Sequence, residues 1–475
     1  MLELSTIVKL ELIQLWRDST VKVLAALLAI LTIYTILSSS YSYEHANEGH
    51  RELKDTARNK MLHQKPTSAH MAGHYGHIAF KPATFLQAID PGVTTFTGTT
   101  VRIEAHRQNE DVFAPAAGQS SLVRFGDLSF SMLLQLVVPL LILFTCYRSV
   151  VNDRLNGTLK LLLSQGISLR KLLAGKIAAY ALVFGTYLLM AAFAYAIAFS
   201  LEKSSAEGGV FLRIIGLLAL YAVYYLMLIS TCVFFSAKSR EPSSLLASLL
   251  ASWFVLTIIL PKAAASIGEQ AAPLPTRMEV SEGIRAKKKL GINGHDKKNV
   301  YTIAFVDSVL KVYGADSVQQ LPIKIGGLLM QADEDFNNAL YDQALGELDS
   351  TVARQNRVGA LTAFADPFMA VKNLSMGIAG TDMYHHFDFT KRVEDYRRVL
   401  IRNLNAQDAL RESAFKDEKG KLTADYWQQT NDFSYTAPGL SWSLRHYYIE
   451  LFALFCWVVL ILSILYFLTN KISVS

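Results

Sequence analysis

The sequence predicts a mostly α-helical membrane protein with six spans and two large extracytoplasmic segments, one α+β and one helical. Its 475 residues are 51% hydrophobic and only 18% charged, with a mean hydropathy of +0.25, which is too apolar for a single soluble enzyme. The apolar residues form six blocks, each near the about 20 residues that a helix needs to cross a bilayer. In runs of this length, only a helix pairs every backbone polar group within lipid. The predicted spans are residues 21–39, 128–147, 177–200, 210–236, 244–261 and 447–468.

The N-terminal residues 1–20 are amphipathic, which predicts an interfacial elbow helix that leads into the first span. A cleaved signal peptide is the alternative, because residues 23–37 are apolar and small serines follow them. The amphipathic stretch is longer than the basic region of a usual signal peptide, which favours a retained span.

Lysine and arginine are concentrated before the first span, between the second and third, after the fourth and after the last. The short loop of residues 201–209 has no basic excess. Because basic residues are enriched in cytoplasmic loops, both termini are expected in the cytoplasm. The formal net charge of +6 then reflects topology, and nucleic-acid binding is not expected.

Residues 41–127 and 262–446 are the two segments expected outside the membrane. In the first, residues 43–61 are a candidate polar helix, and Val101 and Ile103 alternate with charged residues as in a strand. The second has two apolar stripes with spacing typical of helices, which predict two long helices packed against each other. The stripes are Phe336, Leu340, Ala344, Leu348 and Val352, and Phe389, Val393, Tyr396, Leu400 and Leu404.

Asp366-Pro367 predicts the start of a further helix, and Gly380 predicts its end. The first outer segment has few apolar residues to bury, so we expect the two outer segments to fold as one unit.

A basic amphipathic loop, residues 148–176, separates the second and third spans. Its apolar residues recur at helical spacing from Val151, which predicts a helix in the membrane interface with a polar face toward the cytosol. We predict that this face couples the spans to a soluble partner; a helix that only anchors the loop is the alternative. The residues expected at the partner are Asp153, Arg154, Asn156, Gly157, Thr158 and Lys160.

The segment DRLNGTLKLLLSQGISLRKLLAGK, which begins at Asp153, resembles the corresponding loop of type-2 ABC exporter permeases. Asp153 stands where that family more often has glutamate. Four stretches outside the spans resemble a subfamily of these permeases with large extracytoplasmic insertions and a domain of unknown function. They are YGHIAFKPATFLQAIDPGV, VRIEAHRQNE, DPFMAVKNLSMGIAGTDMYHHFDF and EDYRRVLIRNLN.

The resemblance implies the permease subunit of an ATP-driven exporter in the bacterial cytoplasmic (inner) membrane. Its partners would be ABC ATPase subunits, which bind ATP and magnesium, and a second permease copy or a paralogue. The chain itself has no G-x-x-x-x-G-K-[ST] phosphate loop, so we expect neither a cofactor nor enzyme activity in this chain. The alternative is a membrane-anchored scaffold or force-transmitting subunit whose outer domains bind another envelope protein.

Histidines are the usual ligands of zinc and copper, and His70, His74 and His77 are closely spaced. Gly73 and Gly76 disfavour a helix there, and the stretch contains no carboxylate or thiolate. These three residues are therefore weak candidates, and a metal site is not expected. A serine hydrolase is not expected either, because the chain lacks a G-x-S-x-G motif.

Small residues lie on one face of the fifth span, where Ser244, Ser248 and Ser252 are four residues apart. Small residues let helices approach closely in lipid, so this face is expected to pack against another helix or protomer. A polar lining of a translocation path is the alternative. Gln135 in the second span is a further functional candidate, because polar groups inside a membrane are costly.

Overall fold

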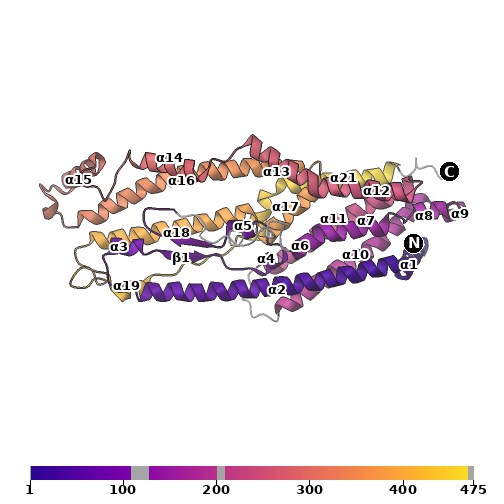
Figure 1. The fold of residues 1–475 in the computed structure, drawn as a ribbon, viewed down its shortest axis with the longest axis horizontal. Coiled ribbons are helices and arrows are strands. Elements are labelled where there is room, and N and C mark those ends of the chain that lie inside the picture. Colours follow the sequence, from indigo (N-terminus) through magenta and orange to yellow (C-terminus); the bar gives the residue numbers. More distant parts are fainter. Residues whose placement is uncertain (1, 109–127, 201–208, 469–475) are drawn as a thin grey trace.

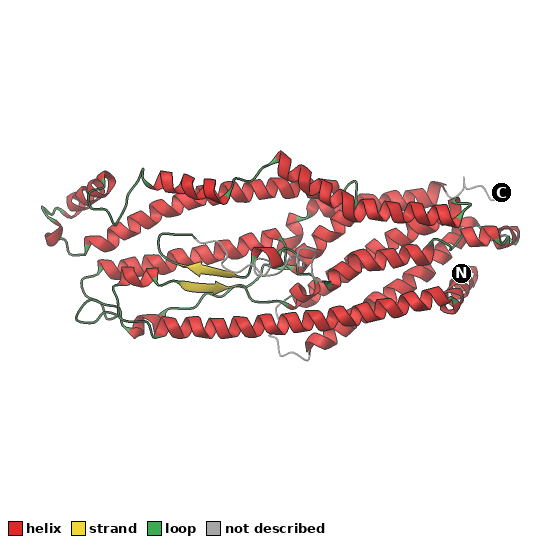
Figure 2. Cartoon of the chain, viewed as in Figure 1, coloured by secondary structure: helices red, strands yellow, loops and turns green. Residues whose placement is uncertain are grey.

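A computed structural model describes residues 2–108, 128–200 and 209–468 of the chain. Its helices and its small sheet confirm the mostly α membrane fold (Figure 2). Residues 201–208 and 469–475, which entered the prediction of topology, lie outside the described residues. The helices long and apolar enough to span a membrane are Ser19–Leu62 (α2), Phe130–Leu155 (α6 to α8), Leu169–Ala198 in α10 (Leu169–Ser200), Val210–Lys238 (α11), Pro242–Ala271 (α12 to α13) and Tyr448–Phe467 in α21 (Tyr448–Leu468).

The molecule is elongated (Figure 1). The N-terminal helix α1 (Leu2–Arg17) lies at the same end as the short helices α8 (Val151–Leu155) and α9 (Thr158–Ser164). The sheet and the long outer helices lie at the other end. This arrangement places the expected elbow helix and the loop after the second span on one side of the apolar helices.

Span one and the polar helix predicted after it are one continuous helix, α2, of 44 residues. At a rise of 1.5 Å per residue it is about 66 Å long, roughly twice the hydrocarbon thickness. Asp18 separates it from α1 and caps its start, because the Asp18 carboxylate accepts a hydrogen bond from the Thr20 N–H at 2.8 Å.

Two spans contain a π-helical turn just before a proline. Span two runs through α6 (Phe130–Met132), η3 (Leu133–Val137) and α7 (Val138–Cys146), and span five through α12 (Pro242–Phe254), η4 (Val255–Ile259) and α13 (Leu260–Ala271). Pro139 and Pro261 follow the π turns. Proline lacks an N–H and its ring crowds the preceding turn, so the helix widens there while the remaining backbone groups stay paired.

The first outer segment forms α3 (Ala69–His74), β1 (His77–Phe80), α4 (Phe85–Ile89), α5 (Thr94–Thr97) and β2 (Thr100–Ile103). The strands are antiparallel, with His77 opposite Ile103. Val101 and Ile103 are buried and Arg102 is exposed, which confirms the predicted alternation. The argument against a helix at Gly73 was wrong, because Ser68 caps α3 by accepting from the Met71 N–H at 3.3 Å.

The second outer segment forms α14 (Arg277–Lys288), α15 (Val300–Tyr313), η5 (Val318–Gln320), α16 (Ile325–Thr362), α17 (Pro367–Ala379), α18 (Met383–Ala409), α19 (Ala424–Gln429) and α20 (Leu440–His446). The two predicted long helices, α16 and α18, pack against each other. Asp366 caps α17, and Gly380, with a φ of 76°, ends it as predicted.

The face by which α16 meets α18 differs from the prediction. Asp333, Glu334 and Asn338 of α16 are buried there, whereas its apolar stripe is only partly buried and lies beside α14. The α18 stripe packs on the first outer segment, in a core shared with Ala72, Val101 and other residues. The two outer segments therefore share one hydrophobic core.

Helix α17 lies beside the apolar helices α11 and α21, a position that the sequence did not predict. The Trp457 indole, about halfway along α21, donates to the Ala363 carbonyl oxygen at 3.0 Å. At the other end of α17, the buried Arg213 guanidinium of α11 donates to the carbonyl oxygen of Ile378 at 2.6 Å. A cation at a helix C-terminus is favourable because unpaired carbonyl groups meet there.

Candidate functional site

The loop after span two forms two short helices instead of the single helix predicted. Helix α8 ends at Leu155 and α9 begins at Thr158, because Gly157 between them has a φ of 75°. That left-handed conformation is strained for any residue with a Cβ. The glycine therefore turns the chain sharply at the end of the molecule (Figure 1). The term elbow means the two short helices α8 and α9, and the N-terminal helix is called α1.

Lys176 holds this elbow to two other elements. Its ammonium lies 2.9 Å from the Asp153 carboxylate of α8 and 2.6 Å from the Glu11 carboxylate of α1, and its side chain is 4% exposed. The preceding Gly175 permits the contact, since a Cβ there would lie 2.5 Å from Ile7 of α1. One buried cation thus connects the elbow, the N-terminal helix and span three.

The end of span four is fastened to the same elbow. The Ser236 hydroxyl accepts from the backbone N–H groups of Val150 and Val151 at 3.0 and 3.1 Å. The Arg154 guanidinium donates to the Ala237 carbonyl oxygen at 2.6 Å. These bonds pair backbone groups that start α8, so the elbow and α11 form one rigid contact.

The structure divides the six predicted coupling residues into two groups. Asp153 and Arg154 turn inward and make the contacts just described, contrary to the predicted cytosolic face. The other four lie at the exposed tip, together with two leucines that are 59% and 56% exposed: Asn156, Gly157, Thr158, Lys160, Leu155 and Leu161. No atom lies within 4 Å of a Cβ built on Gly157, so the tip is open.

Gln135 belongs to a chain of buried polar groups between the spans. Its amide donates to the Tyr221 hydroxyl at 3.0 Å, which lies 2.8 Å from the Ser375 hydroxyl of α17. Ser375 donates to the Asp90 carboxylate at 2.5 Å. These hydrogen bonds join span two, span four, α17 and the first outer segment, and burial makes each of them costly to break.

Ser244, Ser248 and Ser252 are exposed on α12, so within the described part of the chain this face contacts no other helix. The Ser248 hydroxyl only donates to the Ser244 carbonyl oxygen, at 2.9 Å. Packing of this face against a second protomer stays a prediction, as does its alternative, a polar lining of a translocation path.

We expect Ser248→Phe to lower the fraction of dimer, because a phenyl ring prevents close approach of two α12 faces. Chemical cross-linking in detergent, compared with the wild type and with Ser248→Ala, measures that fraction. Equal dimer in all three proteins, with normal accumulation, would show that this face is not the contact.

Two of the three histidines singled out in the sequence meet in the structure, together with two that were not. His70 and His74 lie one turn apart on α3, and their Nε2 atoms are 3.1 Å apart. His106 follows β2 and His295 lies between α14 and α15, with their Nε2 atoms 3.3 Å apart. One ring nitrogen from each of the four lies within 4.8 Å of the others. His77 is elsewhere, beside Trp427.

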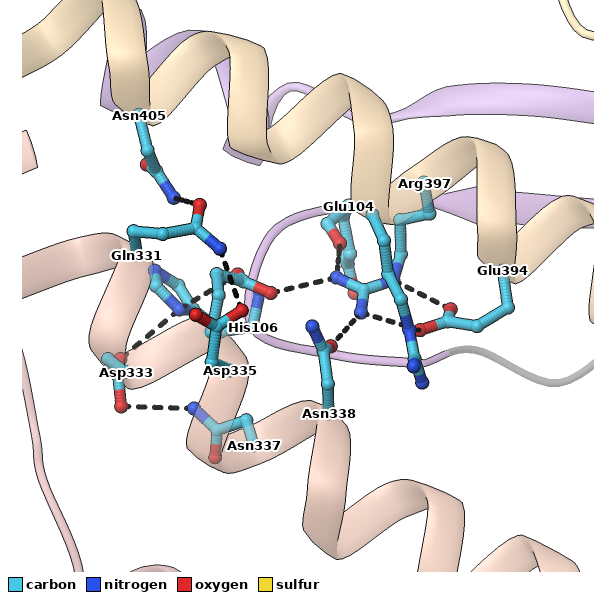
Figure 3. Close-up of polar contacts among 12 residues, drawn as sticks. Glu104, His106, Gln331, Asp333, Asp335, Asn337, Asn338, Glu394, Arg397 and Asn405 are labelled. Carbon is cyan, nitrogen blue, oxygen red and sulfur yellow. Dashed lines mark hydrogen bonds and ion pairs between the residues drawn. The ribbon is translucent and has the colours of Figure 1, made fainter. Parts of the chain in front are cut away.

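Carboxylates of α16 hold His106 from the other side of its ring (Figure 3). Its Nδ1 lies 3.2 Å from Asp333 and 3.1 Å from Glu334, and Glu334 also accepts from the His106 backbone N–H. Burial lowers the pKa of His106, but these carboxylates outweigh it and raise the pKa to about 9. Burial and the neighbouring His106 lower the pKa of His70 to about 4.

Glu334 also belongs to a buried ion-pair network centred on Arg397 of α18. Figure 3 shows Arg397 with Glu394 and Asn338. The Arg397 guanidinium donates to Glu334 at 3.0 Å and to both oxygens of Glu394 at 2.7 Å, and also to Asn338. The pKa of Glu334 falls to about 2, because its pairs with His106 and Arg397 outweigh burial. The network joins α16, α18 and the loop that carries His106.

The structure also places Ser443, His385 and Asp382 in line. Ser443 Oγ lies 3.1 Å from His385 Nε2, and His385 Nδ1 pairs with Asp382. All three side chains are buried, and Arg213 also donates to Ser443, at 3.2 Å. This arrangement fastens α20 to α18 and α11.

Six apolar helices, the elbow after span two and the large outer domain agree with the membrane permease that the sequence resembles. Residues 59–272 match the family model "ABC-2 family transporter protein", and residues 277–436 match "Domain of unknown function (DUF3526)". The two matches together give this chain an ABC-2 transporter domain followed by the additional domain that the sequence resemblance implied, the combination of a type-2 ABC permease with an extra domain. No curated protein matches it.

Proposed function

We propose that the chain is the permease subunit of an ABC exporter in the bacterial cytoplasmic membrane, and that an ABC ATPase drives it through the elbow α8–α9. The observation that supports this is the elbow itself: its tip is open and carries two exposed leucines, while its base is fixed to three helices. Movement of the tip would therefore pull on α1, α10 and α11 together. A second copy of the chain, or a paralogue, completes the proposed complex.

A ligand path within one protomer has little support from the described residues. The cavity lined by Phe130, Leu134, Tyr195 and Tyr221, between spans two, three and four, has a volume of only about 30 Å³, about that of one water molecule. A transport path would therefore lie between protomers or at the surface facing lipid.

One observation favours force transmission as the second candidate function. Helix α2 runs without a break from the membrane into the outer domain. At the end of span five, a Cβ on Gly268 would lie 3.1 Å from the Gln355 carbonyl oxygen of α16, and the Gln355 amide donates to the Ala272 carbonyl oxygen at 2.7 Å. A shift of spans one or five would thus move the outer domain, which could act on another envelope protein.

We expect Gly157→Trp to abolish ATPase binding, because its indole would project from the open tip and hold the partner away. Co-purification with the ATPase and ATP hydrolysis in proteoliposomes measure the effect. Gly157→Asn is the matched control, since asparagine tolerates the left-handed conformation and adds less bulk. Normal binding by the tryptophan variant, when it inserts normally, would contradict the proposal. Asp153→Lys is a poorer test, because it would break the buried pair with Lys176.

Experiments on the same reconstituted complex distinguish transport from force transmission. Vesicles that contain only this permease and its ATPase should accumulate or release substrate if the complex is an exporter. If ATP hydrolysis depends instead on an added envelope protein and no substrate moves, force transmission is the function.

A further inference from the structure

We propose that His70, His74, His106 and His295 form a binding site for one Zn²⁺ ion in the outer domain. The four residues come from three separate parts of the chain: helix α3, the turn after β2 and the loop between α14 and α15. This inference goes beyond the proposed transport function and does not depend on it.

The spacing of the ring nitrogens suits a metal ion. A tetrahedral zinc with Zn–N distances of about 2.0–2.1 Å has nitrogen pairs about 3.3 Å apart. The two Nε2 pairs in the cluster are 3.1 and 3.3 Å apart, and all four ring nitrogens lie within 4.8 Å of one another. Small side-chain movements would bring the remaining pairs to the same distance.

The arrangement of the four rings indicates which metal ion the site would bind. Their six centroid separations are 4.8, 5.4, 5.0, 5.2, 6.1 and 5.0 Å. Six similar edges are those of a tetrahedron, whereas a square has two diagonals much longer than its sides. Tetrahedral coordination favours zinc over copper(II) or nickel(II), and an all-imidazole site disfavours magnesium and calcium.

His106 has carboxylates beside its ring, as metal-binding histidines usually do. Metal-binding histidines usually donate their other ring N–H to a carboxylate, which fixes the ring orientation. The His106 Nδ1 lies next to Asp333 and Glu334, which leaves its Nε2 facing the other histidines. His106 also has a φ of 60°, a strained value that no other non-glycine residue in the described ranges adopts. Such strain persists where the surrounding structure over-determines a position.

Hydrogen bonding alone explains less of the cluster. Each Nε2 pair could share one proton, which accounts for the separations of 3.1 and 3.3 Å. It does not account for two such pairs facing each other, because imidazoles with no ion between them gain nothing from that convergence. A bound ion would satisfy all four nitrogens at once.

The ion would connect the two parts of the chain that match different family models. His70, His74 and His106 belong to the matched region 59–272, and His295 belongs to the region 277–436. His295 lies on an exposed loop with Lys297 and Lys298 close behind it. Zinc would therefore hold this loop against α3 and shield its lysines from proteases.

The test uses the full chain in detergent, purified with a tag that contains no histidine and stripped with EDTA. Titration of Zn²⁺ against a chromophoric chelator should give one site per chain. His295→Ala should weaken zinc binding by at least about tenfold. Even mutation of residues that only hydrogen-bond to metal ligands lowers metal affinity about 10- to 100-fold. His45→Ala, at an exposed histidine of α2, is the matched control and should bind zinc as the wild type does. Equal affinity in all three proteins, or no saturable site, would overturn the proposal.

Two further measurements keep the proposal testable if a variant folds poorly. Cobalt(II) added to the unmodified chain should give the strong visible absorption of tetrahedral coordination, and zinc should displace it. Trypsin cleavage after Lys297 and Lys298 should slow when zinc is added to the wild type, and stay fast in His70→Ala. A weak octahedral cobalt spectrum, or cleavage that zinc does not change, would show that the four histidines do not bind the ion together.

Discussion

Replacing Lys176 with methionine should destroy coupling between ATP hydrolysis and the spans, and should also destabilise the protein. The substitution leaves the buried Glu11 carboxylate and the partly buried Asp153 carboxylate close together, with no cation between them. Removing one partner of a buried ion pair typically costs about 3–5 kcal/mol. Helix α1 and the elbow would then lose the ion pairs that fix them to span three.

Thermal unfolding in detergent and ATP hydrolysis by the reconstituted complex measure the two effects. Lys171→Met is the control, because Lys171 is an exposed lysine of the same helix. Glu11→Gln should be milder than Lys176→Met, since it leaves Lys176 with one carboxylate, that of Asp153. A Lys176→Met protein with normal stability and normal coupling would show that the buried contact carries no force.

The membrane part was predictable because its signal is composition over long windows. Six apolar blocks identified the six helices, although the helices extend beyond the hydrocarbon-length cores, most of all in α2. The break at Gly157 was not predicted. An apolar stripe at helical spacing runs across it, and a stripe does not report the positive φ of a single residue. The inward turn of Asp153 was missed for a related reason, because its partner Lys176, which also pairs with Glu11, is distant in the sequence.

The outer domain was less predictable because its contacts join distant segments. Helix α16 was expected to pack through Phe336 and Leu340, yet its buried face toward α18 carries Asp333 and Glu334. Those acids are buried only because Arg397 and His106 neutralise them. The histidine cluster was missed because its members are distant in the sequence. Close spacing suggested His77 as the third member, whereas the fold brings His106 and His295 to α3.

A sequence signal for the cluster did exist at two points. His70 and His74 are four residues apart, the spacing that places two ligands on one helix face. Asp333 and Glu334 stand in the first third of α16, and acids that become buried there need a cationic partner. Neither signal identifies its partner without the fold.

Replacing Arg397 with methionine should destabilise the outer domain by about 3–5 kcal/mol, because it leaves the buried Glu334 without one of its two cationic partners. Arg397 is 2% exposed and connects α18 to α16 and to the backbone of Glu104, through a 3.4 Å bond from its guanidinium to the Glu104 carbonyl oxygen. Glu394 keeps Arg398, whose guanidinium lies 2.7 Å away, so the loss falls mainly on Glu334. The loop that carries His106 should loosen as a result.

Urea unfolding of the detergent-solubilised chain, followed by the fluorescence of Trp427 in the shared outer core, measures this loss. Arg285→Met is the matched control. Its pair with Glu282 is exposed on α14, with a separation of 3.5 Å, and exposed pairs contribute little to stability. Combining Arg397→Met with Glu334→Gln should recover part of the stability, because the buried charge left without its partner is then removed as well. If the single and the double variant are equally unstable, the loss comes from packing of the Arg397 side chain and the ion-pair explanation is wrong.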